Sequence, residues 1–166
     1  YRDMGILKYW FRAVEKYAPW VNKIHFITWG HLPKWLNTDH PKLHIVNHKD
    51  YIPEVYLPTF SSRPIELNIH RIPGLSEHFV YFNDDMFLNG PVNAEFFFRK
   101  QKPCDFLRCA PVVFSDTTDV YAHVSVNSIR KVNVFYSYAK LFLQHPSKII
   151  NLRYGFAANM DNFAKL

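Results

Sequence analysis

The sequence lacks the long apolar runs of membrane proteins. No stretch of about 18 uninterrupted apolar residues occurs in its 166 residues, and the chain does not open on the basic and apolar segments of a signal peptide. With 48% hydrophobic residues, the chain can form one domain with a core but is too short for two independent domains. We therefore expect a single domain without a transmembrane segment.

Cysteine is also scarce. Cys104 and Cys109 form one C-x4-C pair, and no second pair is present to complete a zinc site. A chain of this length does not need a disulfide for stability. Because cysteine is usually buried, the sequence predicts two reduced, partly buried thiols.

Positive charge exceeds negative charge without forming blocks. Twenty Lys and Arg against fourteen Asp and Glu give a net charge of +6. This excess suits a phosphate-bearing ligand, although nucleic acid or an anionic membrane surface is attracted by the same field. No aromatic and basic motif of a known RNA-binding type occurs, so we expect no nucleic-acid partner.

Hydrophobic periodicity alternates between helix and strand. Apolar residues at helical spacing predict a helix over residues 3–18, which Pro19 ends. Strands are predicted at 23–30, 42–48 and 78–84, and a helix begins near Ser61 and ends before Pro73 and Gly74. Strands that alternate with helices predict an α/β fold, with a Rossmann-like, mostly parallel sheet flanked by helices.

The last third of the chain is predicted to be mainly helical. Residues 104–114 have the composition of a further strand, and residues 123–144 have the apolar spacing of one long helix. We therefore divide the single domain into residues 1–100, which hold the alternating strands and helices, and residues 101–166.

Two adjacent carboxylates, Asp84 and Asp85, follow the third predicted strand. Ligands of open parallel sheets bind at the carboxyl ends of the strands. Like charges are kept together there most readily by a cation, and Mg²⁺ or Mn²⁺ held against a diphosphate fits carboxylate oxygens. The alternative is that one of these residues only caps the turn after the strand.

The helix before this strand supplies a second group of polar residues. Glu66 and His70 are four residues apart and share one helical face, so His70 can act as a general base or acid that Glu66 orients. Arg63 or Arg71 can bind a phosphate through two hydrogen bonds. The alternative is an ordinary surface pair of Glu and His.

Several consecutive motifs resemble one enzyme family. The segments "EKYAPWVNKIHFITWGHLPKWLN", "LPTFSS", "HRIPGLSEHF" and "YFNDDMF" occur in the order found in the Stealth family of hexose-1-phosphate transferases, and the resemblance covers residues 2–97. The family includes bacterial capsular polysaccharide phosphotransferases and the animal N-acetylglucosamine-1-phosphotransferase. The resemblance implies transfer of a sugar 1-phosphate from a UDP-sugar to a glycan hydroxyl, with release of UMP.

The resemblance also implies roles for individual residues. Asp84 and Asp85 match the acidic pair of the family, as catalytic residues and as ligands of Mg²⁺ or Mn²⁺. Glu66, His70 and Arg71 match the helix that precedes this pair, with Glu66 and His70 as catalytic residues. The matching motifs place further candidates in substrate binding, namely Arg2, Arg63, Arg71, Ser61, Ser62 and Asn83. Asn127 is a candidate contact to the acceptor or a phosphate, with a structural role as the alternative.

Two family elements have no match here. An apolar strand with a Trp-Val-Asp-Gly-like turn and a later His-x-Pro-x-Pro element are missing, so we expect a fragment of a larger catalytic domain. The lack of long insertions between motifs indicates a bacterial, cytoplasmic enzyme of capsule or surface-glycan synthesis, attached to a membrane only through other parts. Two other functions stay open: a metal-dependent glycosyltransferase that releases UDP, and a non-catalytic basic domain that binds nucleic acid or a polyanionic glycan.

Overall fold

A computed structural model describes residues 5–104 and 118–150 of the chain. The chain divides into two compact units, Tyr1–Cys104 and Asp105–Leu166, and each is described by itself. Whether both belong to one catalytic domain stays a prediction. Among the described residues, no helix combines the length and the apolar character that crossing a membrane requires.

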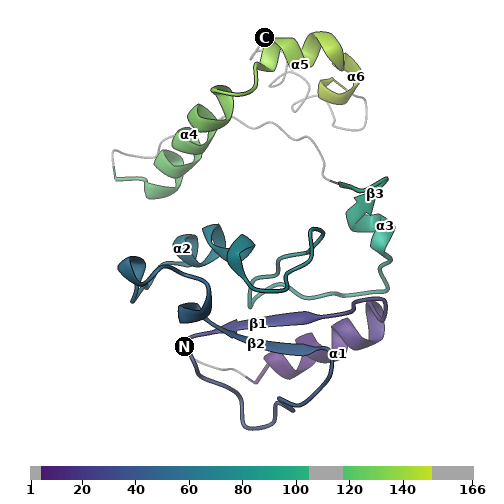
Figure 1. Ribbon diagram of the computed structural model, residues 1–166. Coiled ribbons are helices and arrows are strands. Elements are labelled where there is room, and N and C mark those ends of the chain that lie inside the picture. The colour runs from purple at the N-terminus through teal and green to yellow at the C-terminus, as the bar shows by residue number, and fades with distance from the viewer. Residues whose placement is uncertain (1–4, 105–117, 151–166) are drawn as a thin grey trace. The chain divides into compact units, whose positions relative to one another are not determined.

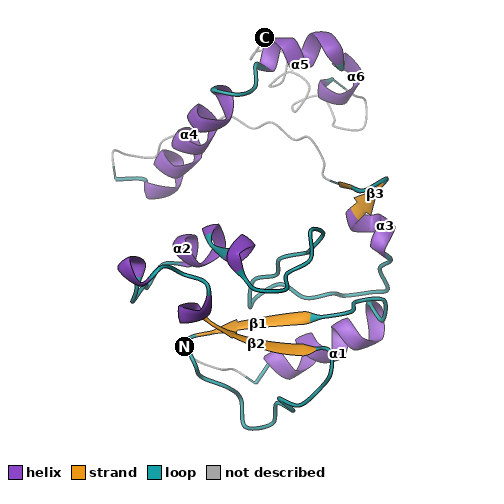
Figure 2. Cartoon of the chain, viewed as in Figure 1, coloured by secondary structure: helices purple, strands orange, loops and turns teal. Residues whose placement is uncertain are grey.

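The first unit mixes short helices with two small sheets (Figures 1 and 2). Its elements are α1 (Leu7–Tyr17), β1 (Ile24–Thr28), β2 (Leu43–Asn47), η1 (His48–Asp50), η2 (Glu54–Tyr56), α2 (Ser62–Leu67), η3 (Ile69–Arg71), α3 (Ala94–Phe97), β3 (Phe98–Arg99) and β4 (Lys102–Pro103). β1 and β2 pair in parallel from Ile24 opposite Leu43 to Thr28 opposite Asn47, while β3 and β4 form a short antiparallel ribbon. The prediction of an α/β chain with parallel strands near 23–30 and 42–48 is confirmed, while a complete Rossmann-like sheet stays a prediction.

The two faces of the β1–β2 sheet pack against different helices. Phe26 points to α1, where its ring lies 5.6 Å from that of Phe11. Its neighbour Ile27 packs on the opposite face, because successive strand side chains alternate. The core on that face consists of Val46, Tyr51, Ile52, Ile69 and Ile72. The sheet therefore lies between α1 and the segment that runs from η1 to η3.

The turn after β1 depends on a glycine. Gly30 has φ +109°, a conformation that residues with a side chain rarely adopt, and a Cβ there would lie 3.4 Å from the Asn47 side-chain nitrogen. The chain consequently turns directly at the carboxyl end of β1 and enters the long loop that leads to β2.

The predicted third strand is wrong for the described part of the chain. Residues 79–83 carry no regular secondary structure, and β1 and β2 pair only with each other. Phe79 and Tyr81 are both 42% exposed. A strand requires a ladder of backbone hydrogen bonds to a neighbouring strand, and among the described residues no such bond joins residues 79–82 to β1 or β2.

Two helix predictions also need correction. The helix expected before Pro73 is interrupted at Asn68, which separates α2 from η3, so Glu66 and His70 do not lie on one continuous α-helix. Asn68 bonds through its side chain to the carbonyl of Pro64 at 2.8 Å and is the C-cap of α2. Residue 70 therefore lies in a separate 3₁₀ turn.

In the described part of the second unit, two helices replace the one long helix that the sequence predicted over 123–144, and a third helix follows them. These are α4 (Val120–Asn133), α5 (Tyr138–Gln144) and α6 (Pro146–Ile149). Asp119 caps α4 by accepting a hydrogen bond from the Ala122 amide at 2.9 Å, and Ser137 starts α5 by accepting one from the Lys140 amide at 3.4 Å. The cap at Ser137 explains why a new helix begins there.

The cysteine prediction is only partly tested. Cys104 is a free thiol, but it is exposed, so the expectation of partial burial is wrong for this residue. Cys109 and most of the strand predicted at 104–114 lie outside the described residues.

Candidate functional site

The candidate site forms where residues 79–85 pass α2. Tyr81 forms a side-chain hydrogen bond with Glu66 of α2, and Asp84 and Asp85 lie within electrostatic range of the same phenol. Burial makes the largest contribution to the raised pKa of Tyr81, and the carboxylates of Glu66, Asp84 and Asp85 raise this pKa further. The Tyr81 hydroxyl therefore stays protonated and donates to Glu66, among three carboxylates. We call Glu66, Tyr81, Asp84 and Asp85 the acidic cluster.

Tyr51 supports the acidic cluster from the core. Its side chain is buried, and its hydroxyl donates to the carbonyl of Ile65 at 3.4 Å. Burial, together with the nearby Tyr81, raises the pKa of Tyr51 to about 12. Because Ile65 precedes Glu66 in α2, this bond fixes the backbone that carries the Glu66 carboxylate.

The other face of the same segment contacts α1. The ring of Phe82 lies 6.0 Å from that of Trp10 in an edge-on arrangement. Tyr81 and Phe82 thus point to elements on opposite faces of the β1–β2 sheet, as neighbouring strand residues do. The acidic pair follows directly after this anchored segment.

The acidic pair itself is exposed. Asp84 and Asp85 form a turn that a backbone hydrogen bond of 3.2 Å from the Met86 amide to the Asn83 carbonyl closes. Such a turn is compatible with the capping alternative as well as with a ligand site. The structure shows that Asp84 and Asp85 are exposed and lie near Tyr81. The chemical role of the two carboxylates stays a prediction.

The donor atoms permit a metal of only one kind. In the ranges 5–104 and 118–150, no group of three or more His, Cys, Asp or Glu side chains is placed to hold a metal ion. Mg²⁺ and related hard cations, however, bind through one or two carboxylates, several waters and substrate phosphates. The exposed carboxylates of Asp84 and Asp85 fit this mode, and they do not fit a preformed protein cage.

The remaining predicted residues are distributed unevenly. Ser61, Ser62, Arg63, His70, Arg71 and Asn83 are exposed on or near α2, η3 and the acidic turn. Asn127 is exposed on α4, in the second unit. Arg2 lies outside the described residues. The structure therefore brings Glu66 together with Asp84 and Asp85, and it leaves the roles of the others as predictions.

Tyr81 was not among the site residues predicted from the sequence. Its signal was nevertheless present, since an alternating run places Tyr81 and Phe82 on opposite faces, and a tyrosine near an acidic pair needs a hydrogen-bond partner when it is partly buried.

Comparison with known proteins identifies the family. The sequence model of Stealth protein conserved region 2 matches residues 1–105. The chain belongs to the Stealth family. The acidic cluster of this Stealth chain lies wholly within the matched region.

Three proteins similar to the Stealth chain come from bacteria. It is 48% identical over 155 residues to the capsular polysaccharide phosphotransferase WcwK of Streptococcus pneumoniae, covering 93% of this chain and 46% of that protein. It is 45% identical over 157 residues to the exopolysaccharide phosphotransferase cps2G of Lactiplantibacillus plantarum, and the match covers 94% of this chain and 46% of that protein. It is 59% identical over 98 residues to the receptor polysaccharide phosphotransferase WefC of Streptococcus oralis, and the match covers 59% of this chain and 30% of that protein. The Stealth chain thus spans about half the length of the first two.

Proposed function

We propose that this chain is part of a phosphotransferase that moves a sugar 1-phosphate from a UDP-sugar to a hydroxyl group of a glycan acceptor, with release of UMP, in capsular or exopolysaccharide synthesis. The observation that carries the proposal is the acidic cluster within the matched family region. The names of the relatives support phosphotransfer to a polysaccharide.

The reaction makes three demands on the protein. The negative charge on the oxygens of the phosphate under attack must be neutralised, the acceptor hydroxyl must lose its proton, and the departing UMP must be stabilised. In the proposal, Asp84 and Asp85 hold Mg²⁺ or Mn²⁺, which when bound neutralises phosphate charge. Exposure of both side chains leaves room for this ion and for a diphosphate.

The proton of the acceptor hydroxyl requires a base. Glu66 and His70 are the candidates, and they differ in their surroundings. Glu66 is half-buried and accepts a hydrogen bond from Tyr81, whereas His70 is exposed in η3. We favour Glu66, because the fixed Tyr81 hydroxyl orients its carboxylate relative to Asp84 and Asp85. Arg63 and Arg71, both exposed, are proposed to bind the phosphates of the donor.

The proposal extends to the fold and the location. A Rossmann-like sheet would contain further strands beside β1 and β2. The bacterial sources of the relatives support a bacterial protein, and we propose a cytoplasmic location.

A labelled donor tests the reaction. The full-length protein is incubated with acceptor glycan, Mg²⁺ or Mn²⁺, and UDP-N-acetylglucosamine labelled on the phosphate next to the sugar. We expect the label in the glycan and UMP as the product, and a loss of roughly a hundredfold or more in rate for Asp84→Asn or Asp85→Asn. Asp39→Asn, which removes an exposed carboxylate from the loop between β1 and β2, is the matched control. Label recovered in UDP would instead identify a glycosyltransferase.

A further inference from the structure

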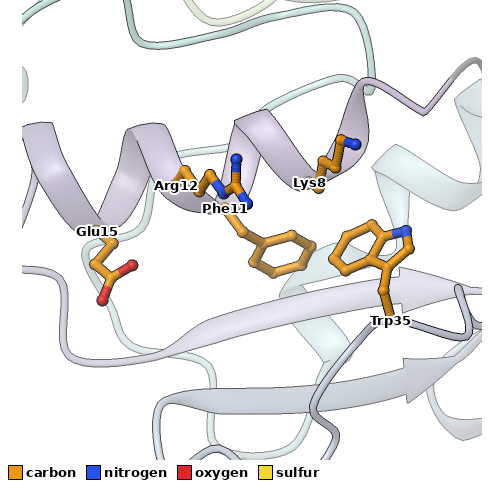
Figure 3. A pocket seen from close by; sticks show the side chains of 5 residues that line it. All are labelled: Lys8, Phe11, Arg12, Glu15 and Trp35. Carbon is orange, nitrogen blue, oxygen red and sulfur yellow. The ribbon is translucent and has the colours of Figure 1, made fainter.

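A second polar and aromatic site lies on α1, away from the residues assigned above. An open surface hollow is lined by Lys8, Phe11, Arg12 and Glu15 of α1 and by Trp35 of the loop between β1 and β2 (Figure 3). We call these five residues the α1 groove. The four helical residues follow the i, i+3, i+4, i+7 spacing of one side of a helix. No family motif noted in the sequence analysis assigned a role to Lys8, Arg12 or Glu15.

The aromatic part of the α1 groove is held in place by the core. Phe11 packs edge-on against Trp35, with ring centres 6.0 Å apart, and against Phe26 of β1, with ring centres 5.6 Å apart. Trp35 nevertheless remains 44% exposed. Aromatic rings that stay exposed while fixed by packing offer a preformed apolar surface with a polar indole N–H, which suits the mixed apolar and hydroxyl surface of a sugar.

The basic part of the α1 groove concentrates positive charge. Lys8 and Arg12 are one helical turn apart and both exposed, and both cations lie over the ring of Tyr9, at 5.2 and 5.7 Å from its centre. Neither forms an ion pair with an acidic side chain in the part of the chain that the structure describes. Two like charges at this spacing repel, so a bound anion stabilises the arrangement.

The two cations suit a phosphate group. An arginine donates two parallel hydrogen bonds to a phosphate, and a lysine adds a mobile point charge. Glu15 lines the groove one turn further along α1 and supplies a hydrogen-bond acceptor for hydroxyl groups. The groove thus combines partners for a phosphate and for a neighbouring sugar ring.

We propose that the α1 groove binds a glycan that contains phosphodiester bonds, with a phosphodiester at Lys8 and Arg12 and the adjacent sugar ring on Trp35. This inference rests on the proposed function, because transfer of a sugar 1-phosphate to a hydroxyl creates a phosphodiester, and an acceptor that is extended repeatedly carries such bonds already. The groove is the docking place of the growing acceptor chain.

One contact connects the α1 groove with the acidic cluster. Trp10, which neighbours Phe11 on α1, packs against Phe82, two residues before Asp84. Both sites belong to the same compact unit, and α1 contacts the segment that carries the acidic pair.

Binding by isothermal titration calorimetry tests the proposal on the full-length protein without donor. The probes are two hexoses joined by a phosphodiester, a neutral disaccharide of the same hexoses, and UDP. We expect the phosphodiester probe to bind at least about tenfold more tightly than the neutral one, and Arg12→Gln or Lys8→Gln to remove most of that difference. Lys16→Gln is the matched control, because Lys16 lies exposed on the same helix over Tyr17 and does not line the groove.

The outcomes separate this inference from the proposed function. Equal binding of charged and neutral probes, equal effects of Arg12→Gln and Lys16→Gln, or competition by UDP at the groove would each overturn the inference. Asp84→Asn combined with Asp85→Asn should leave probe binding unchanged while abolishing transfer. Because no donor is present, failure of the labelled-donor assay does not alter the binding result. Circular dichroism of each variant verifies that it is folded.

Discussion

The Tyr81 hydroxyl donates a hydrogen bond to the Glu66 carboxylate, and it does so between α2 and the segment that ends in Asp84 and Asp85. This bond joins two parts of the chain that are 15 residues apart and that both carry candidate catalytic carboxylates. A hydroxyl donor beside a carboxylate holds that carboxylate in one orientation, which a general base requires.

Removing this hydroxyl should affect both stability and transfer. We expect Tyr81→Phe to lower the free energy of unfolding by about 1 kcal/mol, because the bond involves a charged acceptor but is partly exposed to solvent. The transfer rate should also fall while the affinity for the donor changes little. Urea unfolding and steady-state kinetics of the full-length protein measure the two effects.

Tyr56→Phe is the control for this change. Tyr56 lies in η2 and is 60% exposed, so loss of its hydroxyl should change neither quantity. If Tyr81→Phe behaves as Tyr56→Phe does, the hydrogen bond to Glu66 has no role in orienting the carboxylate.

Acid should destabilise the protein through His25. The Nδ1 atoms of His25 and His44 lie 3.0 Å apart across the paired strands, and burial, with the charges of His44 and Lys23, lowers the pKa of His25 below 6.5. A lowered pKa means that the unfolded chain binds the proton more tightly, so the free energy of unfolding falls as pH drops below about 6.5. Urea unfolding at several pH values between about 7 and 5 should show this slope.

Substituting His25 should reduce that slope. His25→Gln removes one contribution and leaves that of His48, whose pKa burial also lowers. His31→Gln, at an exposed position in the loop after β1, should retain the slope of the unmodified protein. An unchanged slope in His25→Gln would show that the histidine pair does not resist protonation.

The sequence predicted those elements that local patterns determine. The helical spacing around Leu7 and Val14 gives α1, with both residues buried, and the apolar runs around Ile27 and Val46 give two paired strands. Here the same residues carry the local pattern and the burial, so a reading of the sequence is sufficient. The actual start of α1 at Leu7, and not near residue 3, follows Gly5 with its φ of +71°.

The sequence did not predict features that depend on partners. Residues 79–83 have strand composition, but strand formation also requires backbone hydrogen bonds to a neighbouring strand, which composition does not determine. Likewise, the break at Asn68 depends on a side-chain bond to Pro64, and the meeting of Glu66 with Tyr81 depends on the packing of η1 to η3 on the sheet. For the site, the sequence and the family resemblance supplied the carboxylates but not the tyrosine between them.

The core beside β2 should be sensitive to small cavities. Val46 is 1% exposed and contacts the cluster that includes Ile69 and Ile72. We expect Val46→Ala to lower the free energy of unfolding by about 2 kcal/mol, since buried methyl groups are lost and the surroundings relax only partly. Val55→Ala removes the same atoms from a side chain that is 82% exposed and should cost less than about 0.5 kcal/mol. If the urea midpoints of Val46→Ala and Val55→Ala are equal, Val46 does not belong to the core that stabilises the fold.

Trp20 fastens the loop that follows the acidic pair to the end of α1. Its indole N–H donates to the Val92 carbonyl at 2.7 Å, and the Val92 amide donates to the Tyr17 carbonyl at 2.9 Å. Trp20→Phe keeps an aromatic ring beside Phe97 but removes the first bond, so we expect a loss of about 1 kcal/mol in stability and faster exchange of the Val92 amide with solvent.

Trp29→Phe is the matched substitution, because Trp29 is 42% exposed after β1, whereas the Val92 backbone bonds to Trp20 and Tyr17. It should leave exchange of the Val92 amide unchanged in hydrogen-exchange measurements by NMR. Residues 86–92 connect the acidic pair to this anchor, so Trp20→Phe should also lower the transfer rate. An unchanged rate would mean that Phe82 and Tyr81 alone hold the turn at Asp84 and Asp85. Unchanged Val92 exchange in Trp20→Phe would show that the indole bond does not fasten the loop.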